Sequence, residues 1–564
     1  MKKLMKLLPF YLPFLFFGLF ATAQTEAKKV LPNGWHLMDR AETGAFGISL
    51  DKAYQFVKGK KSNTVVVAVI DSGIDTLHED LKEVLWRNPK EIPGNGIDDD
   101  KNGYVDDING WNFIGGKDGR NVTVDSYERD RVYHAYKDKY EEKEIDPATL
   151  QKDELAIYKM WIKAKTEMFE SEETVDILIL KMVYQNLADA DSSLKIAMGK
   201  EIFTGKELEE FKPIGSWLTR AKSSLLGLMK ANEAMEATNE EFMGEFKSYL
   251  GREQRKAEAK DKAPEKFRTN IVKDNYTDFN DRFYGNNNIY VDEISAHHGT
   301  HVSGIIAAKR NNKIGIDGIA DNVRIMTIRA VPDGDEHDKD IALGIRYAVD
   351  NGAQVINMSF GKYFSPEKKW VDEAVLYAKS KGVLFVAAAG NESFNADSLI
   401  HFPSRLLDSG KEVTNWITVG ASADLSFDQV SPEGNPFSSL TAGFSNYGKK
   451  EVDVFAPGMK IYSTVPGGNT YANANGTSMA SPVVAGVAAF ILSYYLDLSA
   501  EQIKYVIENS SVVPPNNVIK PCTSEVVKLS DLSKSGGVIN AFEAIKLAST
   551  LKGERATNKS LKPF

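Results

Sequence analysis

The chain has 564 residues, a formal net charge of −9 and 42% hydrophobic residues. This length suits about two to four domains with a buried core. The mild acidity excludes nucleic acid as a partner, since nucleic-acid binding calls for clustered Lys and Arg. The single cysteine, Cys522, excludes an intrachain disulfide, and no base lies near it in the sequence to activate it as a nucleophile.

The first 23 residues have the pattern of a secretory signal peptide. Three lysines within the first six residues precede an apolar run over residues 7–20, and small residues lead up to Ala23. This pattern predicts export to the periplasm or the medium, with removal of residues 1–23. A retained anchor helix is the alternative. No later stretch is expected to be long and apolar enough to span a bilayer, so we predict no stable membrane span.

A short extension, residues 24–45, precedes the first predicted strand. The run TVVVAVI (64–70) is almost wholly apolar and is followed by Asp71. Short apolar runs of this kind are typical of strands buried on both faces of a parallel sheet. Asp71 is therefore expected at the carboxyl edge of such a sheet, where catalytic and ligand sites gather.

The loop NGIDDDKNGYVDDING (95–110) is rich in calcium-binding residue types. Its acidic and amide side chains match the first half of an EF-hand-like loop, whose twelfth position here is Asn109 where a bidentate Glu is expected. The alternative is a cluster of Asp, Asn and Gly turns without metal, and the sequence leaves both open. The candidate calcium ligands are Asp98, Asp100, Asn102 and Asp106.

Residues 122–268 differ in composition and in residue spacing from the rest of the chain. They contain long charged segments in which apolar residues recur every three or four positions, as in DELAIYKMWIKAKTEMF (153–169). This spacing predicts amphipathic helices. We interpret the region as a helical insertion that forms a bundle or lies over the main domain. It could cover the functional site, recruit substrate or dock a partner. The alternative is a surface insertion without a role, since long insertions are tolerated.

Three histidines, His297, His298 and His301, lie in ISAHHGTHVSG (294–304). The first and third are four apart, which is the spacing of two zinc ligands on one helix face. The metalloprotease pattern also needs a Glu directly after the first His, and that position holds His298. The sequence therefore favours proton transfer over zinc binding.

Further apolar runs at 353–360 and 382–390 predict buried strands, and residues 338–351 and 371–382 have helical patterns between and around them. Alternation of strand and helix indicates βαβ crossovers and hence a mainly parallel sheet with helices on both faces. The predicted fold class is a three-layer α/β fold with a large helical insertion.

Two further polar residues have positions that suit acyl-transfer chemistry. Asn391 follows the strand in LFVAAAGNE, and its amide could donate to an oxyanion. Ser478 lies in NGTSMASPVVAGVAAF (475–490), where a turn leads into a helix of small residues that can be deeply buried. Each feature alone is more often a helix cap or strand end.

Taken together, these segments resemble the subtilisin-like serine proteases, the subtilases of peptidase family S8. The family's signatures correspond to VIDSGID (69–75), HGTHVSG (298–304) and GTSMASP (476–482), in its Asp, His, Ser order, with its oxyanion motif in AAAGNE (387–392). The resemblance covers roughly residues 45–120 and 270–548.

The resemblance implies a catalytic triad of Asp71, His298 and Ser478, with Asn391 in the oxyanion hole. It implies an endopeptidase that needs no cofactor for its chemistry and acts on proteins or peptides. Glu392 would favour basic residues if it faced the cleft, and the alternative places it on the surface. The implied walls of the primary substrate pocket are Ser359, Phe360, Gly361, Ala388, Ala389 and Gly390.

Two departures from the family matter. The extension at 24–45 is too short for the usual folding propeptide, so either folding needs no such helper or the insertion supplies it. The insertion itself separates the Asp and His motifs. A binding protein that kept the fold and lost turnover is the rival hypothesis, and the four intact positions count against it. A lipase or esterase does not fit, because Ser478 is not in a G-x-S-x-G motif.

These observations predict six segments along the chain. They are a signal peptide (1–23), an extension (24–45), the catalytic domain in two parts (46–121 and 269–550), the helical insertion (122–268) and a basic tail (551–564).

Overall fold

The structure is a computed structural model, and it describes residues 31–170, 176–232, 234–235, 237–423, 428–430 and 436–555. The predicted signal peptide and most of the basic tail lie outside these residues, as do residues 24–30 of the extension. The centre of the fold is a seven-stranded sheet in the order β2-β3-β1-β4-β5-β6-β9, and every pairing in it is parallel. Its strands are β1 (Val65–Asp71), β2 (Gly110–Asn112), β3 (Val323–Arg329), β4 (Val355–Met358), β5 (Leu384–Ala388), β6 (Trp416–Ser422) and β9 (Val454–Pro457).

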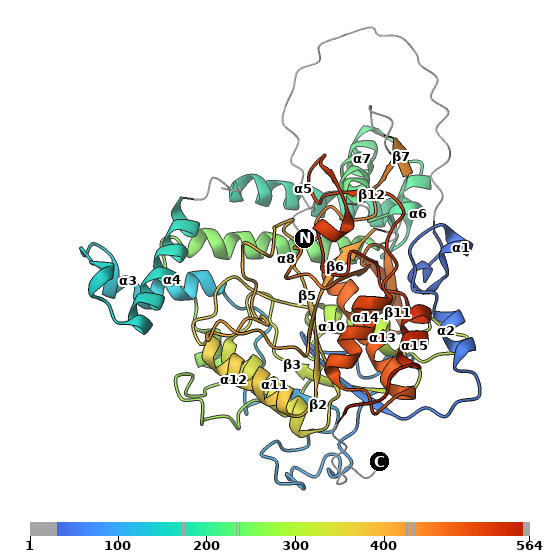
Figure 1. Ribbon diagram of the computed structural model, residues 1–564. Coiled ribbons are helices and arrows are strands. Elements are labelled where there is room, and N and C mark those ends of the chain that lie inside the picture. Colours follow the sequence, from blue (N-terminus) through green and yellow to red (C-terminus); the bar gives the residue numbers. More distant parts are fainter. Residues whose placement is uncertain are drawn as a thin grey trace.

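Helices cover both faces of this sheet (Figure 1). On one face lie α11 (Asp338–Asp350) and α12 (Lys368–Ser380), and on the other lie α10 (Glu293–Ala307) and α13 (Thr477–Tyr494). The three-layer α/β fold predicted from the sequence is thereby confirmed. Successive residues of one strand face opposite sides of a sheet. Accordingly Val65, Val67 and Val69 belong to the core beneath α10 and α13, while Val66, Ala68 and Ile70 belong to the core beneath α11 and α12.

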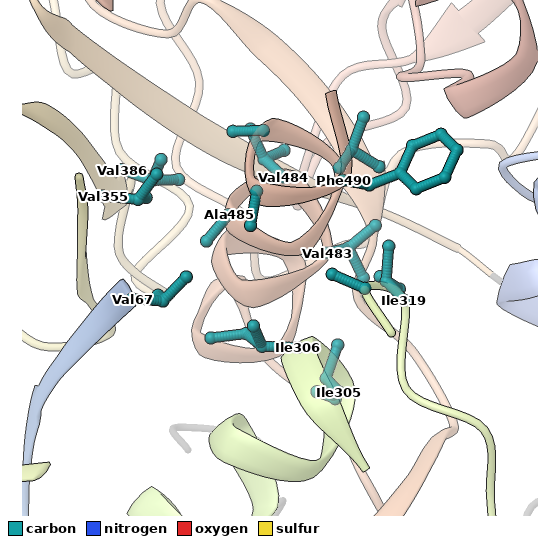
Figure 2. Close-up of a cluster of buried hydrophobic side chains, with 14 of the residues drawn as sticks. Val67, Ile305, Ile306, Ile319, Val355, Val386, Val483, Val484, Ala485 and Phe490 are labelled. Atoms are coloured by element: carbon teal, nitrogen blue, oxygen red, sulfur yellow. The ribbon is translucent and has the colours of Figure 1, made fainter. Parts of the chain in front are cut away.

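The helix α13 is the centre of the larger core (Figure 2). Its small residues let it lie close to the sheet, and Ala485 packs among Val67, Val355 and Val386. The expectation that no later stretch could span a membrane needs correction, because among the described residues α13 is long and apolar enough. It is 89% buried inside the protein, as expected of a core helix.

Shorter elements complete the part of the chain around the main sheet. A hairpin of β10 and β11 packs against α10. A separate four-stranded sheet in the order β13-β12-β8-β7 shares a buried cluster with β9 through Val518 and Phe455. These elements are η1 (Trp35–Leu37), α1 (Arg40–Thr43), α2 (Leu50–Phe56), α9 (Phe267–Ile271), β7 (Asp428–Val430), β8 (Pro436–Ser438), β10 (Ile461–Val465), β11 (Thr470–Ala474), α14 (Ala500–Ser510), β12 (Asn517–Ile519), β13 (Val526–Val527), η3 (Leu529–Asp531) and α15 (Ala541–Ala548).

The region predicted as a helical insertion is helical and has two parts. Four helices, α5 to α8, share a core of their own, whereas α3 and α4 pack together against residues of the main domain. Both arrangements that the sequence left open therefore occur. The helices are α3 (Glu128–Tyr140), α4 (Lys152–Phe169), α5 (Ile177–Met198), α6 (Gly205–Glu210), α7 (Ser216–Ala231) and α8 (Asn239–Glu258), with η2 (Pro147–Thr149) before α4.

Candidate active site

A carboxylate and an imidazole meet at the carboxyl edge of the sheet. Asp71 is the last residue of β1, and His298 lies in the second turn of α10. Asp71 Oδ1 is 2.7 Å from His298 Nδ1. The Asp71 side chain is only 3% exposed, while that of His298 is 39% exposed. The pair therefore presents one ring nitrogen, Nε2, to solvent or substrate and keeps the carboxylate away from water.

Gly299 explains how α10 can approach β1 so closely. A Cβ atom at this position would clash with the carbonyl oxygen of Gly73 and would lie 3.2 Å from both Cβ and Oδ1 of Asp71. Only a residue without a side chain allows this contact. The glycine after His298 therefore has a direct part in bringing the carboxylate and the imidazole together.

The environment of His298 favours its charged form. Burial lowers the pKa of this imidazole, but the charge of Asp71 and the hydrogen bond to it outweigh burial, so the pKa is raised above 6.5. When the carboxylate is ionised, the short contact holds the ring proton on Nδ1. Nε2 is then free to accept a proton, as a general base requires.

The other two histidines of the motif have different surroundings. His301 is fully buried with Nε2 3.1 Å from the carbonyl oxygen of Ala472, and burial lowers its pKa to about 3. It packs between α10 and β11 as a neutral ring. His297 is half-buried, and burial lowers its pKa although Glu241 of α8 opposes the shift.

Ser478 is the second residue of α13 and is joined to the loop after β4 by two hydrogen bonds. Its hydroxyl donates to the carbonyl oxygen of Ser359 at 3.0 Å, and the Ser359 hydroxyl donates to the carbonyl oxygen of Ser478 at 2.9 Å. The second bond has a local cause. Pro482 has no N–H to donate to Ser478 four residues earlier, so the carbonyl is open to Ser359. No hydrogen bond joins Ser478 to His298 in the structure as described.

Asn391 is anchored to the start of α13 by its amide oxygen. This atom accepts hydrogen bonds from the backbone N–H of Thr477 at 2.8 Å and from the Thr477 hydroxyl at 3.0 Å. The amide nitrogen faces the other way. A Cβ atom built on Gly476 would lie 3.5 Å from Ser478 N and 3.7 Å from Asn391 Nδ2. Both nitrogens therefore lie close to Gly476 at the N-terminus of α13, a position that suits a developing negative charge.

The two predicted pocket walls leave neighbouring strands at the same edge. β4 and β5 are paired in parallel, so Ser359–Gly361 and Ala388–Gly390 follow on from adjacent strand ends. Ser359, Ala388 and Ala389 are buried, whereas Phe360 and Gly361 are half-buried. Gly390 has φ +101°, and a Cβ there would clash with the Asn446 amide. The structure thus brings together all six residues predicted to form the walls.

Glu392 lies beside these walls and is held by three donors. Its Oε2 accepts hydrogen bonds from the Tyr363 hydroxyl at 2.6 Å, from Asn446 Nδ2 at 2.9 Å and from the backbone N–H of Asn391 at 3.0 Å. The Glu392 carboxylate therefore already has hydrogen-bond partners from the segments that follow both walls. Neither Tyr363 nor Asn446 was identified from the sequence, because no local pattern marks a residue whose partner lies tens of positions away.

In the acidic loop at 95–110, the carboxylates that lie close enough to share a metal ion differ in part from the predicted ligands. Carboxylate oxygens of Glu91, Asp98 and Asp100 lie within 4.8 Å of one another, an oxygen-only donor set of the kind that calcium prefers. Asp106 instead accepts hydrogen bonds at 2.8 Å from the backbone N–H groups of Gly94 and Gly96.

The remaining predicted ligand of this loop also has protein partners. Asn102 donates to Asp107 at 3.0 Å and accepts a hydrogen bond from the backbone of Tyr104 at 2.8 Å. Glu91 was missed from the sequence because it precedes the loop, and only the fold brings it back to Asp98 and Asp100. The calcium ligand set therefore stays a prediction, with Glu91 as an added candidate.

The fold and the match to a family model define a serine-type peptidase of the subtilisin kind. The profile of the subtilase family (Peptidase_S8) matches residues 62–538, so the chain belongs to that family. It is 45% identical over 197 residues to a thermophilic serine proteinase of Bacillus sp. (strain AK1), which covers 35% of this chain and 42% of that protein. It is 40% identical over 209 residues to subtilisin DY of Bacillus licheniformis, which covers 37% of this chain and 67% of that protein.

Proposed function

We propose that the protein is an exported serine endopeptidase that cleaves peptide bonds through an acyl-enzyme on Ser478. The observation that carries the proposal is the arrangement at one sheet edge. There β1, which ends at Asp71, pairs with β4, and Ser359 after β4 is hydrogen-bonded to Ser478 at the start of α13. His298 is hydrogen-bonded to Asp71, and Asn391 Nδ2 and Ser478 N both lie near Gly476. A base, its orienting carboxylate, a hydroxyl and two donors are the parts that acyl transfer needs.

In this reaction Ser478 Oγ attacks the carbonyl carbon of the scissile bond and His298 Nε2 takes the hydroxyl proton. Asp71 keeps the other ring proton on Nδ1 and stabilises the imidazolium. The oxygen of the tetrahedral intermediate is held by Asn391 Nδ2 and Ser478 N. His298 then gives its proton to the leaving amine. In the second half, water attacks the acyl carbon and gives a proton to His298. The bond to Ser478 Oγ breaks, and His298 returns the proton to that oxygen.

Before attack, the Ser478 hydroxyl has to turn from the Ser359 carbonyl toward His298. The movement that we propose is rotation about the Cα–Cβ bond of Ser478, while α13 holds its backbone. Catalytic hydrogen bonds are often long or absent without substrate and form in the complex. The contact with Ser359 is therefore compatible with the proposed role of Ser478.

The substrate pocket proposed here lies between Ser359–Gly361 and Ala388–Gly390. Apart from Phe360, its walls are formed by small residues and backbone, which suits a large apolar side chain at the residue before the cleaved bond. Glu392 is already bound by Tyr363 and Asn446. Its charge is thereby partly satisfied, so we expect apolar side chains to be favoured over basic ones.

Export and the role of the insertion complete the proposal. Residues 1–23 carry the pattern that predicts secretion, and proteins or peptides outside the cytoplasm are the substrates expected. A docking role for the helical insertion (122–268) stays a proposal from the sequence. The acyl-transfer chemistry requires no metal, and calcium at Glu91, Asp98 and Asp100 would act on stability alone.

A fluorophosphonate probe tests this function directly. The probe labels serines that an adjacent base activates, so protein lacking residues 1–23 should be labelled and the Ser478→Ala variant should not. Hydrolysis of unfolded casein should follow the same pattern. If folded wild-type protein resists the probe, with or without calcium, the site is inactive and the rival hypothesis of a binding protein with this fold is favoured.

A further inference from the structure

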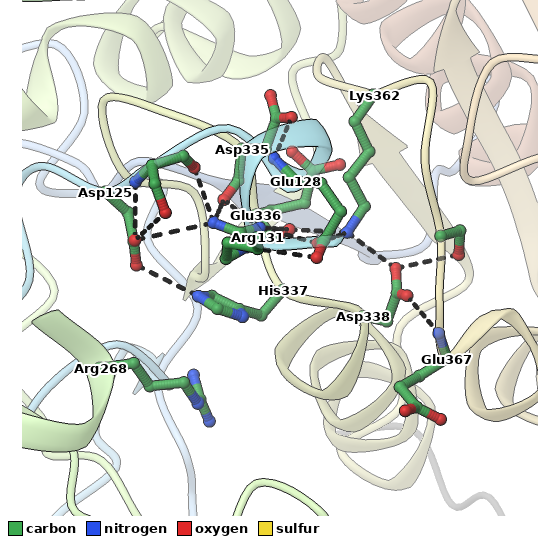
Figure 3. Close-up of polar contacts among 12 residues, drawn as sticks. Asp125, Glu128, Arg131, Arg268, Asp335, Glu336, His337, Asp338, Lys362 and Glu367 are labelled. Carbon is green, nitrogen blue, oxygen red and sulfur yellow. Dashed lines mark hydrogen bonds and ion pairs between the residues drawn. The ribbon is translucent and has the colours of Figure 1, made fainter. Parts of the chain in front are cut away.

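The segment that follows the first pocket wall is buried against the helical insertion. Lys362 comes directly after Gly361, and its side chain is 1% exposed. Its ammonium group contacts Glu128 of α3 at 2.7 Å, the carbonyl oxygen of Glu336 at 2.7 Å and Asp338 at 2.9 Å (Figure 3). A buried charge is stable only when it is paired, so the position of Lys362 depends on α3.

The carboxylate of Glu128 is in turn held by Arg131, one turn further along α3 (Figure 3). Arg131 binds both oxygens of Glu128, at 3.2 and 2.7 Å, and also donates to the carbonyl oxygens of Asp335 and Glu336 at 3.1 Å. The insertion and the main domain thus share one buried ionic network. Such a network has one favoured geometry, because moving any member leaves another charge without a partner.

The helix α4 holds the next two residues of the same segment. Lys163 donates from its ammonium group to the carbonyl oxygen of Tyr363 at 2.9 Å and lies 4.5 Å from the ring centre of Phe364. Phe364 is 4% exposed. It completes a hydrophobic cluster formed by residues from the insertion, namely Val132, Tyr133, Tyr140, Trp161, Ala164, Met168 and Ala259.

The same segment also reaches the opposite pocket wall. The Tyr363 hydroxyl donates to Glu392 at 2.6 Å, and Glu392 accepts from the backbone N–H of Asn391, directly after Gly390. On its other side the segment has main-chain bonds with Phe402 through Lys362, at 2.9 and 2.8 Å. The insertion is therefore linked to both walls through residues 362–363.

We infer that α3 and α4 of the insertion set the position of residues 361–364 and thereby the width of the primary substrate pocket. Lys163 and Glu128 act as positioning residues for substrate selection, and neither touches the reacting atoms. This inference rests on the proposed function, because it assigns a task to the pocket of that same site. It concerns α3 and α4, whose side chains contact residues 362–364. Helices α5 to α8 have a core of their own, and α8 contacts the main domain at Asp333 through Arg252 and Arg255.

The first test is Lys163→Met, which keeps the length of the side chain and removes its hydrogen bond to Tyr363. The Lys163 side chain is 38% exposed, so the variant should fold. Lys159→Met is the matched control, because Lys159 is exposed on the same helix. Peptide p-nitroanilides that differ in the residue before the cleaved bond should be compared, with phenylalanine and alanine at the two extremes.

For Lys163→Met we expect the ratio of kcat/KM for phenylalanine over alanine to change at least fivefold, mostly through KM, and the control to stay within twofold of wild type. Labelling of Ser478 by a small fluorophosphonate, which does not fill the pocket, should stay within twofold in both. Glu128→Gln, which removes the charge that faces Lys362, should change the ratio in the same direction.

Unchanged ratios in folded Lys163→Met and Glu128→Gln, with an active wild type, overturn the inference alone. An equal loss of labelling and of all peptide hydrolysis would show a general structural role and would also overturn it. Failure of the wild type to react with the probe overturns the proposed function instead, and the inference with it. Circular dichroism and thermal unfolding identify any variant that does not fold.

Discussion

The Oδ1 atom of Asp71 lies 2.7 Å from Nδ1 of His298, although 227 positions of sequence separate the two residues. The interval contains the whole helical insertion. Both residues are placed by the sheet and its covering helix, since Asp71 ends β1 and α10 packs against that strand. The long insertion does not separate Asp71 from His298, because both residues lie in elements of the main sheet and its covering helices.

The contact between Asp71 and His298 predicts the pH dependence of the enzyme. A general base has to be neutral, and the pKa of His298 is raised above 6.5 by Asp71. We expect kcat/KM to rise with pH through an inflection above 6.5. Nuclear magnetic resonance titration of His298 in the Ser478→Ala variant should give the same value, without interference from turnover.

In Asp71→Asn the cause of the raised pKa is gone and burial remains, so the inflection should move to lower pH. The asparagine also stabilises the wrong ring tautomer, and kcat should fall by about 10⁴, as in other proteases with this triad. A titration of His298 that does not change in Asp71→Asn would contradict the assigned partnership.

Removal of the Asn391 amide should slow the chemical step. In Asn391→Ala one of two donors to the oxyanion is lost, and we expect kcat to fall by about 10²–10³ with a much smaller change in KM. This range is the one established for subtilisin and is carried over as an expectation. Asn395→Ala is the control, since Asn395 is exposed in the same loop. A decrease of less than tenfold in kcat would argue against Asn391 as an oxyanion donor.

Substitution by alanine at two glycines inside helices should change the free energy of unfolding in opposite directions. A Cβ at Gly304 of α10 would clash with the hydroxyls of Ser463 and Thr464, which donate to the carbonyl oxygens of His301 and Thr300 at 2.7 and 2.9 Å. Gly304→Ala should therefore lower the free energy of unfolding by about 1–3 kcal/mol.

The matched variant is Gly227→Ala in α7. Gly227 is exposed and a Cβ there would meet no atom within 4 Å. The substitution should raise the free energy of unfolding by about 0.5–1 kcal/mol, because alanine loses less conformational entropy in a helix. Urea unfolding measures both variants. Equal effects of the same sign would contradict the packing described for α10.

Calcium should stabilise the protein through the acidic loop. At a calcium concentration 100 times the Kd, binding to the native state contributes about 2.7 kcal/mol. Thermal unfolding should therefore occur at higher temperature with calcium than with EDTA. Asp98→Asn should reduce this difference, whereas Asp99→Asn, outside the cluster of Glu91, Asp98 and Asp100, should change it less. If wild-type protein unfolds at the same temperature in both buffers, the loop is a turn cluster without a metal.

Some features could be predicted from the sequence because their signals are local. The apolar run that ends at Asp71 indicated a buried parallel strand, and the structure has β1 there. The histidine–glycine pair at 298–299 and the small residues after Ser478 fit the close contacts that these positions make. A short motif can be recognised whenever the chemistry or the packing requires particular residues at fixed spacing.

Other features depend on contacts between distant segments. The helical pattern of residues 122–268 predicted amphipathic helices and left open what their apolar faces contact. Only the tertiary structure shows that Phe364 completes the cluster of α3 and α4, and that Glu91 joins Asp98 and Asp100. The sequence could not predict these contacts, because an apolar or acidic residue fits its local pattern whatever distant residue it contacts.

By itself, the sequence determined the family, the parallel α/β fold and the candidate residues Asp71, His298, Asn391 and Ser478, because each belongs to a local motif that acyl transfer requires. The tertiary structure decided the rest. Only there is the Ser478 hydroxyl seen to donate to the Ser359 carbonyl, and Glu392 to accept a hydrogen bond from Tyr363. Only there does Lys362 pair with Glu128 and so connect the insertion to the pocket wall. These arrangements result from how remote elements pack, and the free energy of that packing is a property of the whole fold.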